Sequence, residues 1–246
     1  MTIKGKTAVV TGAAGNAALT IVRTLIEDGA QVALVDADAM RLDSMIRFLR
    51  GTTAAIPCES SEPGAVREAH QKVETVLGPV DILVNCSDAP PPARSDATDP
   101  SDWRRILGSH LDSAFYWSRA VIPAMRKRND GRIVNVVSLA AKGAAVEPGV
   151  ALAAAHGALA SLTFALARET AANGITVNAI ALGAIEGSSA VEPLNDAQRR
   201  QMLAQIPVGR FCRPEELAHA VRFLVSPLAG FITGEVLDLN GGVLMD

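Results

Sequence analysis

Residues 6–20 read KTAVVTGAAGNAALT, an apolar, β-branched run that passes through a glycine-containing turn into an Ala-rich stretch. This order predicts a strand at Lys6–Thr11 and a helix at Ala17–Asp28. A second apolar run, Gln31–Asp36, predicts the next strand and ends on an acidic side chain. In such a unit the turn at the helix N-terminus can cradle a pyrophosphate, and the acidic residue can bond a ribose.

The rest of the chain continues to alternate strands with helices. Further strands are predicted at Ala54–Cys58, Asp81–Asn85, Gly131–Ser138, Thr176–Ile180 and Glu235–Leu239, and helices at Arg41–Arg50, Pro63–Leu77, about Asp102–Arg128, about Gly149–Asn173 and from Pro214. Apolar strands alternating with helices predict a parallel sheet covered on both faces, which is a doubly wound α/β fold. No linker or repeat divides residues 1–246, so one domain is predicted. The polar, Gly/Ser-rich stretch at about 185–207 is interpreted as a mobile flap over a cleft.

Composition limits the partners that the chain is expected to have. The net charge is −3 and 49% of residues are hydrophobic, which favours neither a nucleic-acid partner nor an anionic membrane. No N-terminal apolar segment and no apolar run of spanning length are found, so we expect a cytoplasmic protein without a membrane anchor. The three cysteines, Cys58, Cys86 and Cys212, match no metal-ligand spacing, and we expect free thiols and no metal site.

Motifs along nearly the whole chain resemble the short-chain dehydrogenases/reductases. DILVN at 81–85, GRIVN at 131–135 with Ser138 after it, and GITVN at 174–178 match strands of that family. The C-terminal signature is matched by FITG at 231–234 and NGG at 240–242. The resemblance implies a Rossmann-like fold and an NAD(P)-dependent oxidoreductase framework.

The resemblance also shows that the nucleotide-binding motifs are altered. In the family's T-G-x-x-x-G-x-G turn, Thr11 and Gly12 match, but Asn16 and Ala18 stand for the later glycines. The family's N-N-A-G begins here with Asn85 and continues Cys-Ser-Asp, which places the carboxylate of Asp88 where a glycine is expected. By this resemblance the cofactor positions are Gly12, Asn16, Asp36 and Asn85. We expect no cofactor or weakly bound NAD, because Asp36 would repel the 2′-phosphate of NADP.

The catalytic residues that the resemblance implies are lost at three positions of four. The family's Tyr-x-x-x-Lys falls on Leu152 and His156, its Asn falls on His110, and only Ser138 remains. Leucine cannot transfer a proton, and the chain has one tyrosine, Tyr116, for which packing is the favoured interpretation. Two interpretations of His110 and His156 stay open: they fill space at lost positions, or they form a rewired acid–base site with Ser138.

Three functions fit this pattern. The first is a non-catalytic subunit that stabilises or regulates a hetero-oligomeric NAD-dependent hydroxyacyl(-CoA) dehydrogenase, as a tetramer with an active homologue. Heteromeric family members of the hydroxybenzylsuccinyl-CoA dehydrogenase kind suggest this arrangement. The resemblance places the main interface on the two long helices, where a patch of Ala and Leu with Phe115 and Trp117 is expected. The second is an active oxidoreductase with a rewired site, and the third is a ligand-sensing or scaffold protein.

Overall fold

The fold is built on a parallel β-sheet, seen in a computed structural model that describes residues 3–88, 94–143 and 149–245. Its strands are β1 (Thr7–Thr11), β2 (Gln31–Asp36), β3 (Thr53–Pro57), β4 (Ile82–Asn85), β5 (Gly131–Ser138), β6 (Ile175–Leu182) and β7 (Val236–Leu239). They lie in the order β3-β2-β1-β4-β5-β6-β7, and every pair is parallel. The order reverses direction between β1 and β4, where doubly wound folds bind their ligands.

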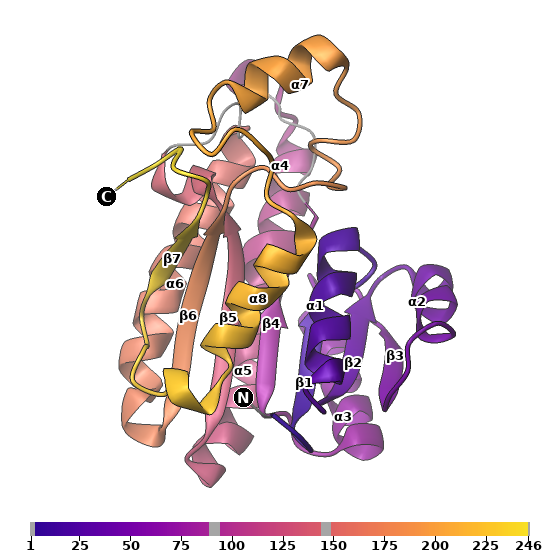
Figure 1. Ribbon diagram of the computed structural model, residues 1–246. Helices are drawn as coiled ribbons and strands as arrows, with labels where there is room; N and C mark the ends of the chain where they lie inside the picture. The colour runs from indigo at the N-terminus through magenta and orange to yellow at the C-terminus, as the bar shows by residue number, and fades with distance from the viewer. Residues whose placement is uncertain (1–2, 89–93, 144–148, 246) are drawn as a thin grey trace.

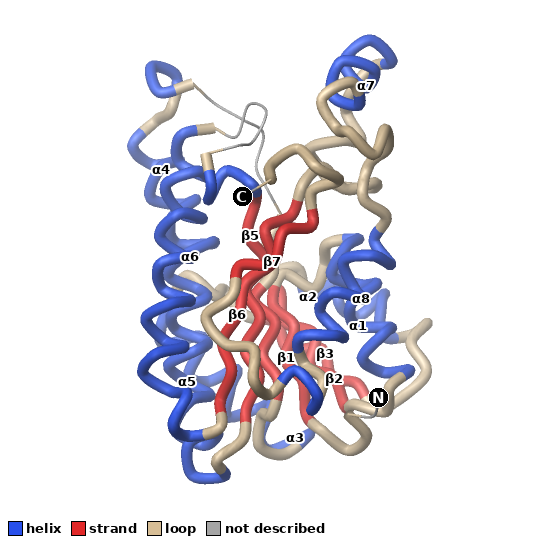
Figure 2. Tube along the Cα trace, turned by 60° about the vertical axis from the view of Figure 1, so that its left-hand side comes forward, coloured by secondary structure: helices blue, strands red, loops and turns tan. Residues whose placement is uncertain are grey.

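Helices cover both faces of this sheet (Figures 1 and 2). They are α1 (Asn16–Glu27), α2 (Ala39–Ile46), α3 (Pro63–Leu77), α4 (Pro100–Leu107), α5 (Ser113–Arg128), α6 (Val150–Thr170), α7 (Asp196–Leu203) and α8 (Pro214–Leu224). The apolar sides of α1 and α8 form one core with the sheet, and those of α3, α5 and α6 form the other. The predicted single-domain, doubly wound α/β fold is therefore confirmed.

The stretch predicted as one helix over about Asp102–Arg128 is helical throughout, but it contains a turn of different geometry that was not predicted. A π-helical turn at Gly108–Asp112 separates α4 from α5. The hydroxyl of Ser113, at the start of α5, donates to the carbonyl of Ser109 in this turn at 2.7 Å. A single wide turn of this kind redirects the side chains that it carries, and such turns occur often at functional sites. Here the turn carries His110 into the interior, where the side chain is 4% exposed.

The aromatic residues predicted for the α5 surface are divided between the surface and the core. Phe115 is 41% exposed, whereas Trp117 is fully buried between α5, α3 and the sheet. The indole N–H of Trp117 donates to the hydroxyl of Ser60 at 3.1 Å, which satisfies its one polar group. The two residues are two positions apart and so point to different sides of the helix. Trp117 is thus wrong as a surface residue.

The long helix α6 is the most apolar helix in the part of the chain that the structure describes. Together with the short turn after it, Val150–Asn173 is the one described helix that meets the length and composition of a membrane span. Half of that stretch is buried within the protein, where α6 packs on β5 and β6. Its apolar character is accounted for by this burial in the core of the fold.

Candidate functional site

A cavity of about 190 Å³ opens at the carboxyl ends of the central strands. Its floor comes from the segments that follow four strands, and its outer wall comes from α7 and the loop before it, which lie above the strand ends in Figure 1. The lining includes Gly12 and Gly15 after β1, Ser87 and Asp88 after β4, Ser138 and Leu139 at the end of β5, and Gly183 and Ile185 after β6. The segment predicted as a flap, about 185–207, therefore covers this cavity; its mobility stays a prediction.

Two histidines from separate helices meet beside the cavity. Nε2 of His156, on α6, lies 3.0 Å from Nδ1 of His110, in the π-helical turn. The backbone N–H of Ser138 donates to Nδ1 of His156 at 2.8 Å. His156 must then carry its proton on Nε2 and donate it to Nδ1 of His110. The hydroxyl of Ser87 is also 2.7 Å from that Nδ1, so the same lone pair serves both donors.

These contacts hold both imidazoles in the neutral form. Burial lowers the pKa of His110 to about 4, with a smaller effect from the nearby Arg105. Burial also lowers the pKa of His156 to about 3, and His110 adds to the effect. The only acceptor nitrogen of each ring already receives a hydrogen bond, so protonation would remove one. Near neutral pH the pair offers no acidic proton.

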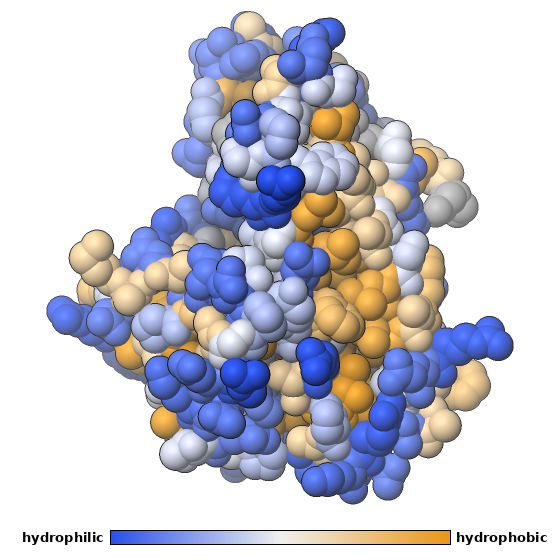
Figure 3. All heavy atoms as spheres, turned by 180° about the vertical axis from the view of Figure 1, so that it is seen from behind, coloured by the Kyte–Doolittle hydropathy of each residue, from blue (hydrophilic) through white to orange (hydrophobic). Residues whose placement is uncertain are grey.

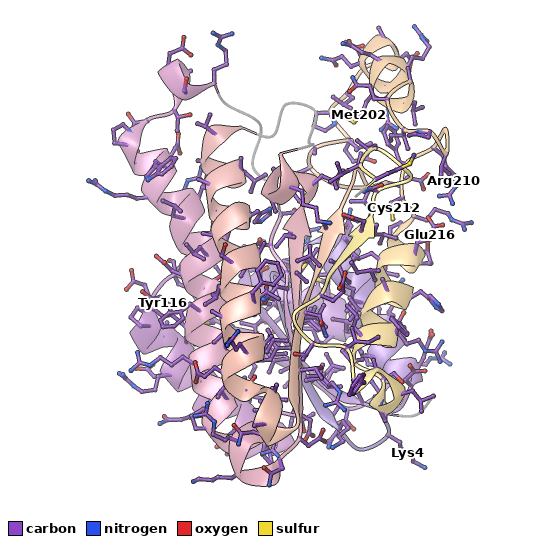
Figure 4. The ribbon with its side chains drawn as sticks, turned by 90° about the vertical axis from the view of Figure 1, so that its left-hand side faces the viewer. Lys4, Tyr116, Met202, Arg210, Cys212 and Glu216 are labelled. Atoms are coloured by element: carbon purple, nitrogen blue, oxygen red, sulfur yellow. The ribbon has the colours of Figure 1, made fainter. Side chains whose placement is uncertain are left out.

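Leu152, the position that the resemblance assigns to the family's tyrosine, is part of an apolar wall. Leu152 packs in a cluster with Ile106, Ala151 and Ala155, and it lines the cavity. The remaining predicted residue, Ser138, ends β5, and its hydroxyl accepts the backbone N–H of Ala140 at 3.2 Å. Tyr116 lies on α5, far from the flap in Figure 4, with its ring 5.8 Å from that of Phe115. It therefore does not replace the missing donor.

The turn after β1 keeps the backbone shape of a nucleotide-binding turn. Gly12 has φ +58°, and a Cβ on it would lie 2.4 Å from the carbonyl oxygen of Cys86. Only glycine fits this position. The hydroxyl of Thr11 donates to the same carbonyl at 3.0 Å and fastens the turn to the end of β4.

The side chains at this turn do not fit a dinucleotide. The amide of Asn16 donates to the carbonyl of Gly187 at 3.1 Å, and its oxygen accepts from Arg41 at 3.1 Å. Asn16 thus bridges the turn to the segment after β6, across the passage between them. Asp88 faces Gly15, where a Cβ would lie 3.5 Å from its carboxylate oxygen. A pyrophosphate here would meet this bridge and a negative charge.

The two other predicted cofactor residues have internal partners. The carboxylate of Asp36 accepts the backbone N–H groups of Ala14 at 3.1 Å and Asp38 at 3.0 Å. Asn85 is 4% exposed and donates to Asn135 at 2.8 Å, inside the sheet. Asn85 therefore lies inside the sheet, and Asp36 is engaged with the backbone that follows β1 and β2.

Sequence reasoning missed two contributors to this site. Ser87, which bonds His110, sits in the altered N-N-A-G stretch and had been considered only through its neighbour Asp88. Arg41, which bonds Asn16, had no motif to mark it. Burial raises the pKa of Asp88, and the charge of Arg41 opposes part of this rise. Among the described residues no group of three His, Cys, Asp or Glu side chains is arranged to hold a metal ion.

Comparisons with known proteins agree with this architecture. Residues 12–244 match the family model described as enoyl-(acyl carrier protein) reductase. The 3-oxoacyl-(acyl-carrier-protein) reductase FabG of Vibrio cholerae is 36% identical over the full length of both chains. A crystal structure from Sinorhizobium meliloti, assigned as a short-chain alcohol dehydrogenase, superposes with a TM-score of 0.91 at 30% identity and covers 98% of this chain and 97% of that one. The chain belongs to the short-chain dehydrogenase/reductase family.

One further relative in the family is a subunit of a larger enzyme. The (2S)-((R)-hydroxy(phenyl)methyl)succinyl-CoA dehydrogenase subunit BbsC of Thauera aromatica is 34% identical over 97% of this chain and 94% of its own length. The family has thus been identified correctly from the sequence. Departures from the family pattern at Leu152, His156, Asn16 and Asp88 stay predictions from the sequence.

The altered turn predicts very weak cofactor binding. We expect isothermal titration calorimetry to detect no saturable binding of NAD or NADP by the unmodified chain. The double variant Asn16→Gly/Asp88→Gly removes both the bridge and the charge, and it should strengthen NAD binding at least tenfold, or about 1.4 kcal/mol. Asp43→Gly, an exposed change on α2, serves as a control and should have no effect. A micromolar NAD dissociation constant for the unmodified chain would contradict this prediction.

Proposed function

We propose that this chain is a non-catalytic subunit of a cytoplasmic hetero-oligomeric dehydrogenase of the short-chain dehydrogenase/reductase family. It would stabilise or regulate an active homologue that carries the NAD-dependent chemistry on a hydroxyacyl(-CoA) substrate. The observation that carries the proposal is the proton-donor position, which is held by Leu152 in an apolar wall. His156, beside it, is held neutral by the backbone of Ser138 and by His110.

The relatives support a dehydrogenase as the class of partner. FabG of Vibrio cholerae is named as a reductase, and BbsC is named as a subunit of a hydroxyacyl-CoA dehydrogenase. A homologue in the same assembly that supplies the chemistry would explain why this chain keeps the scaffold without the proton donor.

The outer sides of α5 and α6 form a surface suited to such a partner. Small residues spaced by three or four positions face outward on α6: Ala154, Ala158, Ser161 and Ala165. Phe164 on α6 is 49% exposed and Phe115 on α5 is 41% exposed. Figure 3 shows hydrophobic side chains gathered on this side of the molecule. Small residues let helices approach closely, and exposed aromatic rings beside them favour association.

The proposal predicts mixed oligomers that depend on this surface. On co-expression with an active homologue from the same genome, native mass spectrometry should show mixed tetramers. Ala158→Arg places a long charged side chain between the helices, and it should shift the mixture to separate species. Ala204→Arg, after α7, is the matched control and should leave the tetramers intact. Recovery of only separate homo-oligomers from the unmodified pair would reject the subunit role.

The alternative of an active oxidoreductase with a rewired site has one observation in its favour. Ser138, His156 and His110 are brought together, as that interpretation requires. However, both imidazoles have lowered pKa values and their acceptor nitrogens are occupied. The ligand-sensing or scaffold role draws its support from the cavity itself.

A further inference from the structure

The segment above the cleft, residues 185–207 and here called the covering segment, packs around a small apolar core of its own. Val191 and Ile206, with Phe211 just beyond the segment, are each at most 7% exposed and form one cluster, against which Met202 packs. This cluster is distinct from the two cores that join the helices to the sheet. We therefore expect the covering segment to keep its shape and to move as one body about its attachments.

Polar contacts within the covering segment support the same conclusion. The guanidinium of Arg199, on α7, donates to the carbonyl of Val191 at 3.2 Å and lies 5.9 Å from the centre of the Phe211 ring. At the start of α7, the side chains of Asn195 and Gln198 form a capping box. All of these contacts are made within residues 185–211, and they do not fix the segment to α1 or α2.

Attachments of the covering segment to the rest of the protein lie at its base and near the start of α1. At the base, the backbone N–H of Glu186 donates to the carbonyl of Cys212 at 2.9 Å, and the N–H of Cys212 donates to the carbonyl of Ala184 at 2.9 Å. From α1, the amide nitrogen of Asn16 donates to the carbonyl of Gly187 at 3.1 Å. The base can act as a hinge, whereas the contact from Asn16 opposes rotation about that hinge.

Arg41 decides which way the amide of Asn16 faces. A guanidinium can only donate, and that of Arg41 donates to the amide oxygen of Asn16 at 3.1 Å. The amide nitrogen is therefore turned to the carbonyl of Gly187, which can only accept. With the amide reversed, its nitrogen would face the guanidinium and its oxygen would face the carbonyl, so both hydrogen bonds would be lost. Arg41 is itself held in α2, where Asp38 accepts its backbone N–H at 2.9 Å.

We propose that Arg41, Asn16 and Gly187 form a latch, built into the chain itself, that holds the covering segment in place over the cleft. The latch opens when the hydrogen bond from Asn16 to Gly187 breaks, and the segment then rotates about its base at Cys212. The motion that the sequence predicts for residues 185–207 is therefore controlled by one side chain of α1. The cleft itself is open to solvent, and the latch sets the position of its outer wall. This inference does not depend on the proposed assembly with a homologue.

Methyl NMR on the full chain, labelled at the methionine methyl groups, tests the latch. Met202 lines the cleft, so its signal changes when the covering segment moves away from the sheet. In Asn16→Asp the carboxylate still accepts from Arg41 but cannot donate to Gly187, and it repels that carbonyl. The open population should rise about fivefold, as expected for the loss of one hydrogen bond, and the Met202 signal should shift or broaden accordingly. Arg41→Met lets the amide of Asn16 turn, and it should shift Met202 in the same direction by a smaller amount.

Two controls separate an opened latch from a general effect. Gln71→Glu adds the same charge on the exposed side of α3 and should leave Met202 unchanged. Met125, fully buried under α5, should not respond in any variant. The proposal is overturned if Asn16→Asp leaves the position, width and number of the Met202 signals unchanged, or if Met125 changes as much as Met202. It is also overturned if Arg41→Met moves Met202 in the opposite direction. Mixed oligomers are tested separately by native mass spectrometry, so failure of the latch leaves the subunit role standing.

Discussion

The purified chain should show no NAD- or NADP-dependent turnover of hydroxyacyl or ketoacyl substrates. A positioned general acid or base contributes about 10²–10⁴-fold to the rate, and Leu152 cannot supply it. His156 does not compensate, because its pKa is lowered to about 3 and it has no acidic proton near neutral pH. The measurement is the absorbance of the nicotinamide at the highest cofactor concentration that the assay allows, with an intact homologue assayed in parallel.

Substitutions distinguish a chain that has lost its catalytic site from one whose site has been rewired around the histidines. If the chain turns over faster than about 1 s⁻¹ and the rate disappears in His156→Ala, the rewired-site alternative is correct. Tyr116→Phe is the matched control and should change nothing, because Tyr116 is partly buried on α5 and does not line the cavity. Leu152→Tyr/His156→Lys alone should stay inactive, since Asn16 and Asp88 still obstruct the cofactor. Combined with Asn16→Gly/Asp88→Gly, it should give the first measurable turnover.

The fold could be predicted because its signals are local and repeated. The run Lys6–Thr11, the turn at Gly12 and the acidic end of β2 each follow from neighbouring residues, and the structure places all three as expected. Gly12 is decisive, since its positive φ and its contact with Cys86 admit no side chain. The π-helical turn between α4 and α5 was missed because no proline interrupts residues 100–113 beyond Pro100, and a wide helical turn has no simple sequence pattern.

For the site, the sequence predicted which residues stand at the family's functional positions, but not how those residues contact one another. Those positions located His110, Ser138, Leu152 and His156, but they could not show that the two rings touch. His110 and His156 are 46 residues apart, and the tautomer of the pair depends on a backbone N–H from β5. The bridge from Asn16 to Gly187 spans 171 residues. Contacts of this range depend on how the segments pack in space, so a single sequence does not reveal them.

The neutral histidine pair predicts marked acid sensitivity of the folded state. In the unfolded chain each imidazole titrates near 6.5, whereas in the folded chain the pKa values are about 4 for His110 and about 3 for His156. Between the folded and unfolded pKa values the unfolded chain binds more protons than the folded chain. The contribution of the two imidazoles to the free energy of unfolding is therefore present above about pH 6.5 and is lost as the pH falls. Two such groups should lower the free energy of unfolding by about 3 kcal/mol between about pH 6.5 and pH 5. Urea unfolding at a series of pH values measures this.

The pH window identifies the groups responsible. Glu216, paired with Arg210, has its pKa lowered to about 2, and such carboxylates lose their stabilising effect only below about pH 4.5. His70, partly buried on α3, has a lowered pKa and adds to the loss in the same direction as the pair. In the double variant His110→Asn/His156→Asn, the free energy of unfolding should therefore change much less between pH 6.5 and pH 5. The part of the change that is due to His70 should remain. His219→Asn, exposed on α8, should leave the slope unchanged. If the free energy of unfolding of the double variant depends on pH as strongly as that of the unmodified chain, the two imidazoles are not held neutral. His156 would then again be a candidate acid at neutral pH.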